Sequence, residues 1–284
     1  MDSKNLEPLN TRSILNYYGI KPSKGLGQNF IVNDGILAEI AKSARIDPND
    51  IVLEIGPGFG SLTRHLALAS KKVVVVELDR KLIPALQDIL QSFQNIRIVQ
   101  GDILEINPGD LIQDENYLVV ANIPYYITSN LIRHLLESEL KPRKIVITVQ
   151  KEIAERICFA EKGNLLANSI RAFGEPSILM NIPASVFYPK PNIDSSVIQI
   201  DLYKEPFLNR VEMNDFFLIM KAGFSQKRKT LRNSLASGLH KGAEEIISLL
   251  GSAGIDPMRR AETLDLEEWK EILQEYRKRN SAIT

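Results

Sequence analysis

Apolar positions along the first half of the chain follow two alternating patterns. Short, nearly continuous Val, Ile and Leu runs occur at residues 51–55, 73–76, 96–99, 117–120 and 145–149. Such runs are typical of strands that are buried on both faces. The segments between them have helical periodicity, and Ile36 to Ala44 forms an apolar helical face before the first run. Strands that alternate with helices predict a doubly wound, parallel α/β sheet.

The pattern changes in the second half of the chain. Runs at 177–182 and 196–202 predict two further strands, which we expect to form an antiparallel hairpin at the sheet edge. From residue 205 on, helical patterns dominate, at 215–222, 231–239, 243–250 and 266–276. We therefore predict an α/β domain over residues 1–204, followed by a small C-terminal helical domain over residues 205–284.

Composition narrows the functional classes only slightly. The 284 residues carry 35 Lys and Arg against 35 Asp and Glu, so net charge alone gives no sign of nucleic-acid binding. The lone Cys158 excludes a disulfide within the chain, and the three scattered histidines lack metal-ligand spacing, so we expect no metal site. With neither a secretory signal nor a run near the roughly 18 apolar residues of a membrane span, we expect a cytoplasmic protein.

A glycine-rich loop follows the first predicted strand. Its sequence, Glu54-Ile-Gly56-Pro-Gly58-Phe-Gly60, would let a ligand approach the backbone at the start of a helix. Glu77 ends the second strand, where a carboxylate can accept both hydroxyls of a ribose. The G-x-G-x-G spacing favours a nucleoside ligand such as S-adenosylmethionine over NAD, whose pattern is G-x-G-x-x-G. An NAD site, or a tight turn without any ligand, remains open.

Polar residues also follow the third and fourth strands. Asp102 is placed to accept a hydrogen bond from an adenine amine, although alone it is more often a turn or helix-capping residue. The fourth strand ends in Asn122-Ile123-Pro124-Tyr125. Pro124 biases Ile123 toward an extended conformation, which helps to fix the direction of its carbonyl.

The Asn122 motif suits the chemistry of an exocyclic adenine amine. That amine is a poor nucleophile because its lone pair is delocalised into the ring. The Asn122 carboxamide oxygen and the Ile123 carbonyl, both aimed at its N–H groups, would localise the lone pair, and Tyr125 offers a ring on which a base can stack. The alternative is a plain Asn-x-Pro turn with packed tyrosines.

A basic segment lies in the predicted helical domain. Residues 221–232 carry five Lys or Arg, and no acid occurs between Asp215 and Glu244. Leu231, Leu235 and Leu239 supply a core-facing stripe that leaves the cations for phosphates. A solvated helix face would have a similar composition.

Taken together, the motifs resemble those of the ribosomal RNA adenine dimethyltransferases, a family that includes the bacterial small-subunit enzyme and the erythromycin-resistance methyltransferases. The resemblance covers nearly the whole chain. It rests on Leu26-Gly-Gln-Asn-Phe30, the glycine loop, Glu77-Leu-Asp79, Gly101-Asp102, Asn122 to Tyr125, Gln150 to Arg156, Phe187-Tyr-Pro-Lys-Pro191, Asp194-Ser195, the basic segment and Arg259 to Leu264. The chain departs from the family around Lys190-Pro191-Asn192 and around Gly163 to Leu166.

The resemblance implies a role for each matching residue. S-adenosylmethionine would be held by Asn29, Ile31, Gly56 (methionine part), Glu77 (ribose), Asp102 (adenine) and Asn122. Of these, Asn122 would also face the target amine. Phe187 would stack on the target base opposite Tyr125. From the residues alone, Asn29 is a loop residue and Phe187 a buried anchor before a proline-rich turn.

The resemblance implies a Rossmann-like, S-adenosylmethionine-dependent methyltransferase domain with a helical RNA-engaging domain. The substrate would be two adjacent adenosines near the 3′ end of small-subunit ribosomal RNA, methylated at N6 to N6,N6-dimethyladenosine within a small-subunit precursor. We expect a monomer. The alternatives are a large-subunit adenine methyltransferase that confers macrolide resistance, a ribosome-assembly factor without catalysis, and a nicotinamide-dependent oxidoreductase.

Overall fold

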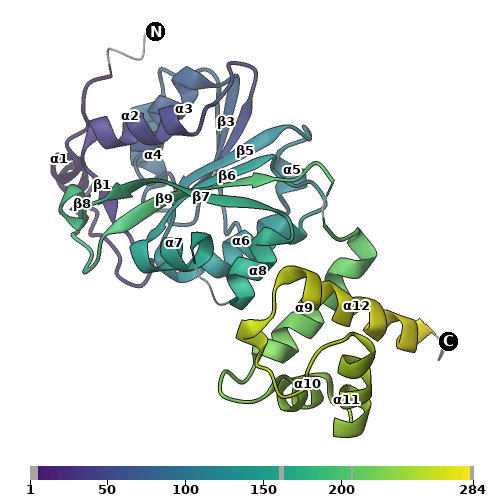
Figure 1. The fold of residues 1–284 in the computed structure, drawn as a ribbon. Coiled ribbons are helices and arrows are strands. Elements are labelled where there is room, and N and C mark those ends of the chain that lie inside the picture. Colours follow the sequence, from purple (N-terminus) through teal and green to yellow (C-terminus); the bar gives the residue numbers. More distant parts are fainter. Residues whose placement is uncertain (1–5, 160–162, 206, 282–284) are drawn as a thin grey trace. The chain divides into compact units, whose positions relative to one another are not determined.

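The structure is a computed structural model that describes residues 6–159, 163–205 and 207–281 (Figure 1). The chain divides into two compact units. The first extends to Glu155 and also includes Pro176–Leu202, and the second comprises Arg156–Glu175 and the chain from Tyr203 on. The predicted boundary at residue 204 lies next to the last crossing between them. No change of composition marks the two earlier crossings.

A seven-stranded sheet forms the centre of the first unit, in the order β4-β3-β2-β5-β6-β9-β7. The strands are β2 (Ile51–Ile55), β3 (Lys72–Glu77), β4 (Ile96–Gln100), β5 (Tyr117–Asn122), β6 (Lys144–Gln150), β7 (Gly174–Ile182) and β9 (Ser195–Leu202). Strands β2 to β6 are parallel, and β9 runs antiparallel to β6. The doubly wound α/β prediction is confirmed, and the two late strands lie side by side at one edge.

Both faces of the central strands β2, β3, β5 and β6 are buried, which explains their nearly continuous apolar runs, whereas β4 is only partly buried. One face packs on α2 (Asp34–Ser43), α3 (Ser61–Ala69) and α4 (Ile83–Leu90) through Val52, Val73, Val75 and apolar residues of the helices. On the other face, α6 (Thr128–Glu137) buries Leu131 and Leu135 completely. Two short helices complete this unit, α1 (Thr11–Tyr17) and α5 (Pro108–Leu111), and α7 (Lys151–Cys158) follows β6 directly.

The N-terminal segment is attached to the sheet domain by a small second sheet. Strand β1 (Phe30–Ile31) pairs antiparallel with β8 (Phe187–Tyr188), which places Ile31 opposite Phe187. The Phe30 ring stacks on Phe59 of the glycine loop, with 4.4 Å between the ring centroids. Neither the two-residue strand nor α1 has a clear periodic signal in the sequence, because both are short.

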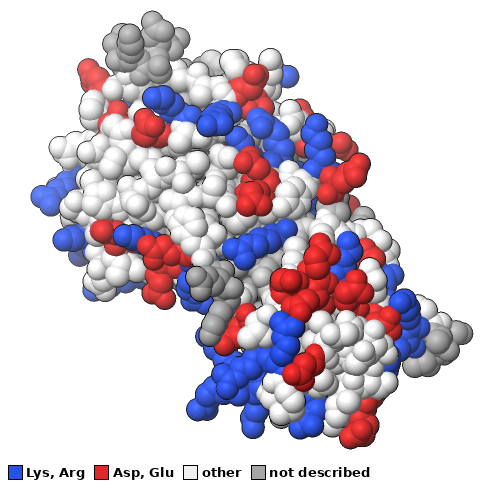
Figure 2. All heavy atoms as spheres, viewed as in Figure 1, with Lys and Arg blue, Asp and Glu red and all other residues white. Residues whose placement is uncertain are grey.

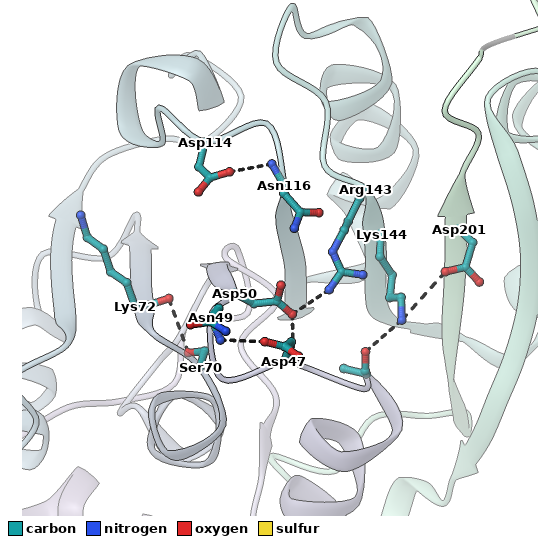
Figure 3. Close-up of polar contacts among 11 residues, drawn as sticks. Asp47, Asn49, Asp50, Ser70, Lys72, Asp114, Asn116, Arg143, Lys144 and Asp201 are labelled. Carbon is teal, nitrogen blue, oxygen red and sulfur yellow. Dashed lines mark hydrogen bonds and ion pairs between the residues drawn. The ribbon is translucent and has the colours of Figure 1, made fainter.

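Charged side chains form a network at the end of the sheet where β2 and β6 begin (Figure 3). Asp50, which is buried, accepts from Arg143 at 2.7 Å and from the backbone N–H of Asp47 at 2.7 Å. The Lys144 ammonium donates to the carbonyl of Ala44 at 3.1 Å and lies 3.9 Å from Asp201. We call Asp50, Arg143, Lys144 and Asp201 the amino-end network.

The second unit is helical. Its helices are α8 (Leu165–Arg171), α9 (Arg210–Phe224), α10 (Leu231–Leu239), α11 (Ala243–Ser252) and α12 (Leu266–Ser281). Asn209 and Glu212 form a capping box that starts α9, and the buried Trp269 of α12 packs against Phe224. The predicted C-terminal helices are confirmed. No helix among the described residues is long and apolar enough to cross a membrane.

Candidate functional site

A cleft of about 180 Å³ lies at the carboxyl ends of β2, β3 and β5. The carboxyl ends of parallel strands meet at one edge of a doubly wound sheet, which is where such folds bind ligands. Seven of the eight residues predicted for the site line this cleft: Asn29, Ile31, Gly56, Glu77, Asp102, Asn122 and Tyr125. The eighth, Phe187, does not.

The glycine loop between β2 and α3 forms the floor of the cleft. Gly56, Gly58 and Gly60 have φ angles of 66°, 61° and 82°, a left-handed conformation that strains residues with a side chain. A Cβ at Gly58 would also lie only 2.9 Å from the Phe30 ring. The glycines therefore serve two needs, the turn itself and the close approach of the N-terminal segment.

Glu77 is held in place by the backbone around it. Its carboxylate accepts hydrogen bonds from the N–H of Gly58 at 3.1 Å and from the N–H of Asp79 at 2.8 Å. Only 5% of Glu77 is exposed, and burial raises its pKa to about 7. The glycine loop and the end of β3 thus fix a buried carboxylate where the prediction places a ribose.

Glu54 is a second buried carboxyl group in the cleft. Its Oε2 accepts no hydrogen bond from any part of the chain that the structure describes. Burial, with a smaller contribution from the negative charge of Glu77, raises its pKa to about 8. None of the ion pairs among the described residues involves either acid. In the sequence, Glu54 is part of the glycine motif, but the pattern of that motif predicts no role for it.

Asn122 ends β5, and its side-chain amide is oriented by a backbone carbonyl. The Nδ2 group donates to the carbonyl of Asn29 at 3.2 Å. This bond fixes which end of the carboxamide faces Asn29 and directs Oδ1 away from it. Asn122 is therefore arranged to present an acceptor within the cleft.

Tyr125 begins a short 3₁₀ turn after β5, and its side chain is anchored at the far end. The hydroxyl group lies 2.6 Å from Oγ of Ser195, which is completely buried in β9. This hydrogen bond fixes the tilt of the ring. Ser195 of the Asp194-Ser195 motif therefore supports Tyr125, while the Asp194 carboxylate accepts from the N–H of Ala184.

Asp102 and Phe187 are placed differently from one another. The Asp102 carboxylate lines the cleft and also accepts from the N–H of Leu104 at 2.9 Å, as a turn residue would. Phe187 is only 4% exposed and belongs to the hydrophobic core, opposite Ile31. The stacking role of Phe187 stays a prediction.

The family is decided by a comparison with known sequences. The model of a family described as "Ribosomal RNA adenine dimethylase" matches residues 20–278. The chain belongs to this family. It is thus an enzyme, an rRNA adenine dimethyltransferase, and the family and fold imply a methyl donor of the S-adenosylmethionine type.

Curated relatives and solved structures agree with this assignment. "Ribosomal RNA small subunit methyltransferase A" of Dehalococcoides mccartyi (strain CBDB1) is 44% identical over 93% of this chain and 92% of its own. The protein of the same name from Lysinibacillus sphaericus (strain C3-41) is 38% identical over 93% and 94%. A dimethyladenosine transferase structure from Plasmodium falciparum has a TM-score of 0.73 at 26% identity, covering 87% of this chain and 97% of that one. The 23S rRNA methyltransferase ErmE gives 0.66 at 25%, covering 87% and 98%.

Proposed function

We propose that this enzyme transfers methyl groups from S-adenosylmethionine to N6 of two adjacent adenosines near the 3′ end of small-subunit ribosomal RNA, giving N6,N6-dimethyladenosine. The observation that carries the proposal is the meeting of Asn122, Glu77 and Asp102 in one cleft. Relatives at 38–44% identity, named for the small subunit, support the choice of RNA. The protein would act as a monomer in the cytoplasm, on precursors of the small subunit.

The residues of the cleft fit S-adenosylmethionine. Glu54 and Glu77 are buried carboxyl groups without a cation from the described chain, and this donor carries positive charge on its sulfur and its amino group. Gly56 leaves room beside the backbone, Glu77 would hold the ribose and Asp102 the adenine, with Asn29 and Ile31 on the N-terminal wall. When bound, the donor supplies an electrophilic methyl group.

The chain's own contribution to the reaction is to activate the adenine amine. Asn122 Oδ1 and the carbonyl of Ile123 are the two acceptors for its N–H groups, and the Asn29 carbonyl keeps Asn122 in the required orientation. Accepting both N–H bonds concentrates the lone pair on N6. Tyr125, anchored by Ser195, holds the plane of the base, with Phe187 proposed on the opposite face. The base would be taken out of its stack to reach this position.

The second unit supplies a basic surface for RNA. Figure 2 shows Lys and Arg side chains gathered near α10. A cavity of about 210 Å³ in this unit is lined by Arg156, Lys227 and Lys229 together with Asn164 and a single acid, Glu262. Such a concave surface, with three cations against one acid, suits the phosphates of an RNA backbone.

One alternative keeps some support. The likeness to the 23S rRNA methyltransferase ErmE leaves adenine methylation of the large subunit, with macrolide resistance, as a second candidate. A purely structural assembly factor would not need an oriented Asn122 carboxamide in a donor cleft.

The test uses small ribosomal subunits from a strain that lacks adenine dimethylation. The subunits are incubated with the protein and labelled S-adenosylmethionine, and the RNA nucleosides are analysed by mass spectrometry. Labelled N6,N6-dimethyladenosine is the expected result. Label only on large-subunit RNA would favour the resistance enzyme, and no label with tight RNA binding would favour the assembly factor.

A further inference from the structure

Residues 23–31, which we call the strap, form the N-terminal wall of the cleft. Six consecutive residues of the strap, Leu26 to Ile31, line the cavity. The strap is bound on one side to residues 122–126, at the end of β5 and just after it. There the carbonyl of Asn29 accepts from Asn122, and Gly27 lies close to Pro124 and Tyr126. On the other side it is bound to the end of β3. This second attachment is made by side chains to which neither the family motif nor the proposed reaction assigns a role.

Gln28 makes the attachment to β3. Its Nε2 donates to Oδ2 of Asp79 at 2.8 Å, and its Oε1 accepts from the N–H of Ser23 at 2.7 Å. Both ends of the amide are thus used, one to close the turn of the strap and one to bind a carboxylate. A hydrogen bond to an ionised acceptor is about twice as strong as a neutral one.

Asp79 connects this attachment to the ribose-binding position. Its Oδ1 accepts from the N–H of Lys81 at 3.0 Å, which shapes the turn after β3. Its own N–H donates to Glu77 at 2.8 Å. A direct series of hydrogen bonds therefore runs from Ser23 through Gln28 and Asp79 to the carboxylate of Glu77.

We propose that Gln28 and Asp79 form a latch that holds the strap against β3 and so positions Glu77 and the cleft wall for the methyl donor. Both are positioning residues, since they act through Glu77 and the strap. The inference rests on the proposed use of the cleft for S-adenosylmethionine. The β1–β8 pairing and the Phe30–Phe59 stack anchor the strap at its C-terminal end, and the contacts of Gly27 and Asn29 do not depend on the latch. Loss of the latch would therefore loosen residues 23–29 and leave the rest of the domain folded.

The latch can be reversed in polarity, which gives a sharp test. Gln28→Glu places a carboxylate against Asp79 and removes the donor. Adding Asp79→Asn restores a bond in the opposite direction, because the introduced carboxamide can donate through its Nδ2 to the carboxylate now at position 28. The Oδ1 of that carboxamide can still accept from the N–H of Lys81. The double variant also has the net charge of the wild type. Tyr18→Phe is the matched control, since Tyr18 donates to Asp88 at 2.6 Å elsewhere on the N-terminal segment.

Two measurements on the full chain test the latch without requiring catalysis, one of ligand binding and one of amide hydrogen exchange. Calorimetric binding of S-adenosylhomocysteine should weaken by about tenfold in Gln28→Glu, the equivalent of about 1.4 kcal/mol. Amide hydrogen exchange of residues 23–29 in the unliganded protein should accelerate, because the segment then opens locally. The double variant should recover both to within about threefold of the wild type, and Tyr18→Phe should change neither.

Turnover gives a third measurement. In Gln28→Glu the KM for the donor should rise more than kcat falls. Three results would contradict the latch. The first is a double variant that binds S-adenosylhomocysteine no more tightly than Gln28→Glu. The others are unchanged binding in Gln28→Glu and a loss in Gln28→Glu that is confined to kcat. If the wild type itself does not bind S-adenosylhomocysteine, the proposed function fails instead, so the two failures are distinguishable.

Discussion

The two ends of the central sheet differ in whether their buried charged groups have partners of opposite charge. At the amino-end network, the buried Asp50 is paired with Arg143, and the Lys144 ammonium is held by a carbonyl and Asp201 (Figure 3). At the cleft, Glu54 and Glu77 are equally buried, yet no cation of the described chain pairs with them. At the amino end of the sheet the buried charges are thus paired, whereas the carboxyl end holds two buried acids without a cation from the described chain.

This difference separates stability from function. A buried carboxyl group without a cation destabilises its ionised form, which is why the pKa values of Glu54 and Glu77 are raised to about 8 and about 7. Proteins retain such destabilising groups where they serve function, and here a positively charged methyl donor would supply the missing positive charge. We therefore expect substitutions at the cleft to change activity, and substitutions in the amino-end network to change stability.

The largest expected effect is at the cleft. Asn122→Ala removes the acceptor for the target amine, and methyl transfer should fall by about a thousandfold, as when a donor is lost from an oxyanion hole. Unfolding by urea should change little, and binding of S-adenosylhomocysteine should be weakened but retained. Single-turnover transfer to small subunits is the measurement. Near-normal transfer would contradict the proposed role of Asn122.

The next effect concerns the pH dependence of stability. The pKa of Glu54 is about 8 in the folded protein against 4.5 for an unperturbed group, so the folded state keeps a proton that the unfolded chain releases. The stabilisation is complete below pH 4.5 and is lost as the pH rises through 8. In Glu54→Gln the decline between about pH 5 and about pH 9 should be smaller by about 3 kcal/mol.

Urea unfolding of the unliganded protein at both pH values measures this difference. Glu77 remains in both proteins, and burial, the largest cause of its raised pKa, acts in both curves. Parallel declines in wild type and variant would show that Glu54 is ionised in the folded state, and the comparison between the two ends would fail.

At the amino end, the expected loss is one of stability. Arg143→Met leaves Asp50 buried without its cation and should destabilise the fold by about 2 kcal/mol, less than for a completely buried pair because Arg143 is one-third exposed. Adding Asp50→Asn should recover part of this loss. Methyl transfer per folded molecule should stay at the wild-type rate. A fall in that rate at unchanged stability would assign the network a role in catalysis.

The smallest effect tests the support of Tyr125. Tyr125→Phe and Ser195→Ala remove the same hydrogen bond, so each should lower kcat by about fivefold, or about 1 kcal/mol. Because the two changes remove one interaction, the double variant should be no slower than the slower single variant. Fully additive losses would mean that Ser195 does not act through Tyr125.

Much of this arrangement could be predicted from the sequence, because local periodicity sets the strands. The apolar run 51–55 matches β2, and 73–76 lies within β3 with one residue more at each end. The cleft followed from the rule that parallel strands end together, which brings Glu77, Asp102 and Asn122 to one edge. Position along a predicted strand was enough to locate these side chains.

Features that depend on distant partners could not be predicted in this way. Asp50 and Arg143 lie 93 positions apart, and Gln28 and Asp79 lie 51 apart, so no local pattern connects them. Glu54 was missed for another reason, since it lies inside β2, where the pattern indicates only a buried strand position. For Phe187 the apolar pattern indicated a buried anchor, which matches its burial, while its role at the base stays a prediction.

The pairing of β1 with β8 has a consequence for a chain that is still being synthesised. Residues 30–31 leave the ribosome early, but their partner strand at 187–188 follows long after the glycine loop, Glu77 and Asn122. A nascent chain could therefore assemble the parallel strands while one wall of the cleft still lacks its attachment. Capacity to retain the methyl donor would then arise late in biosynthesis, after most of the first unit has already folded.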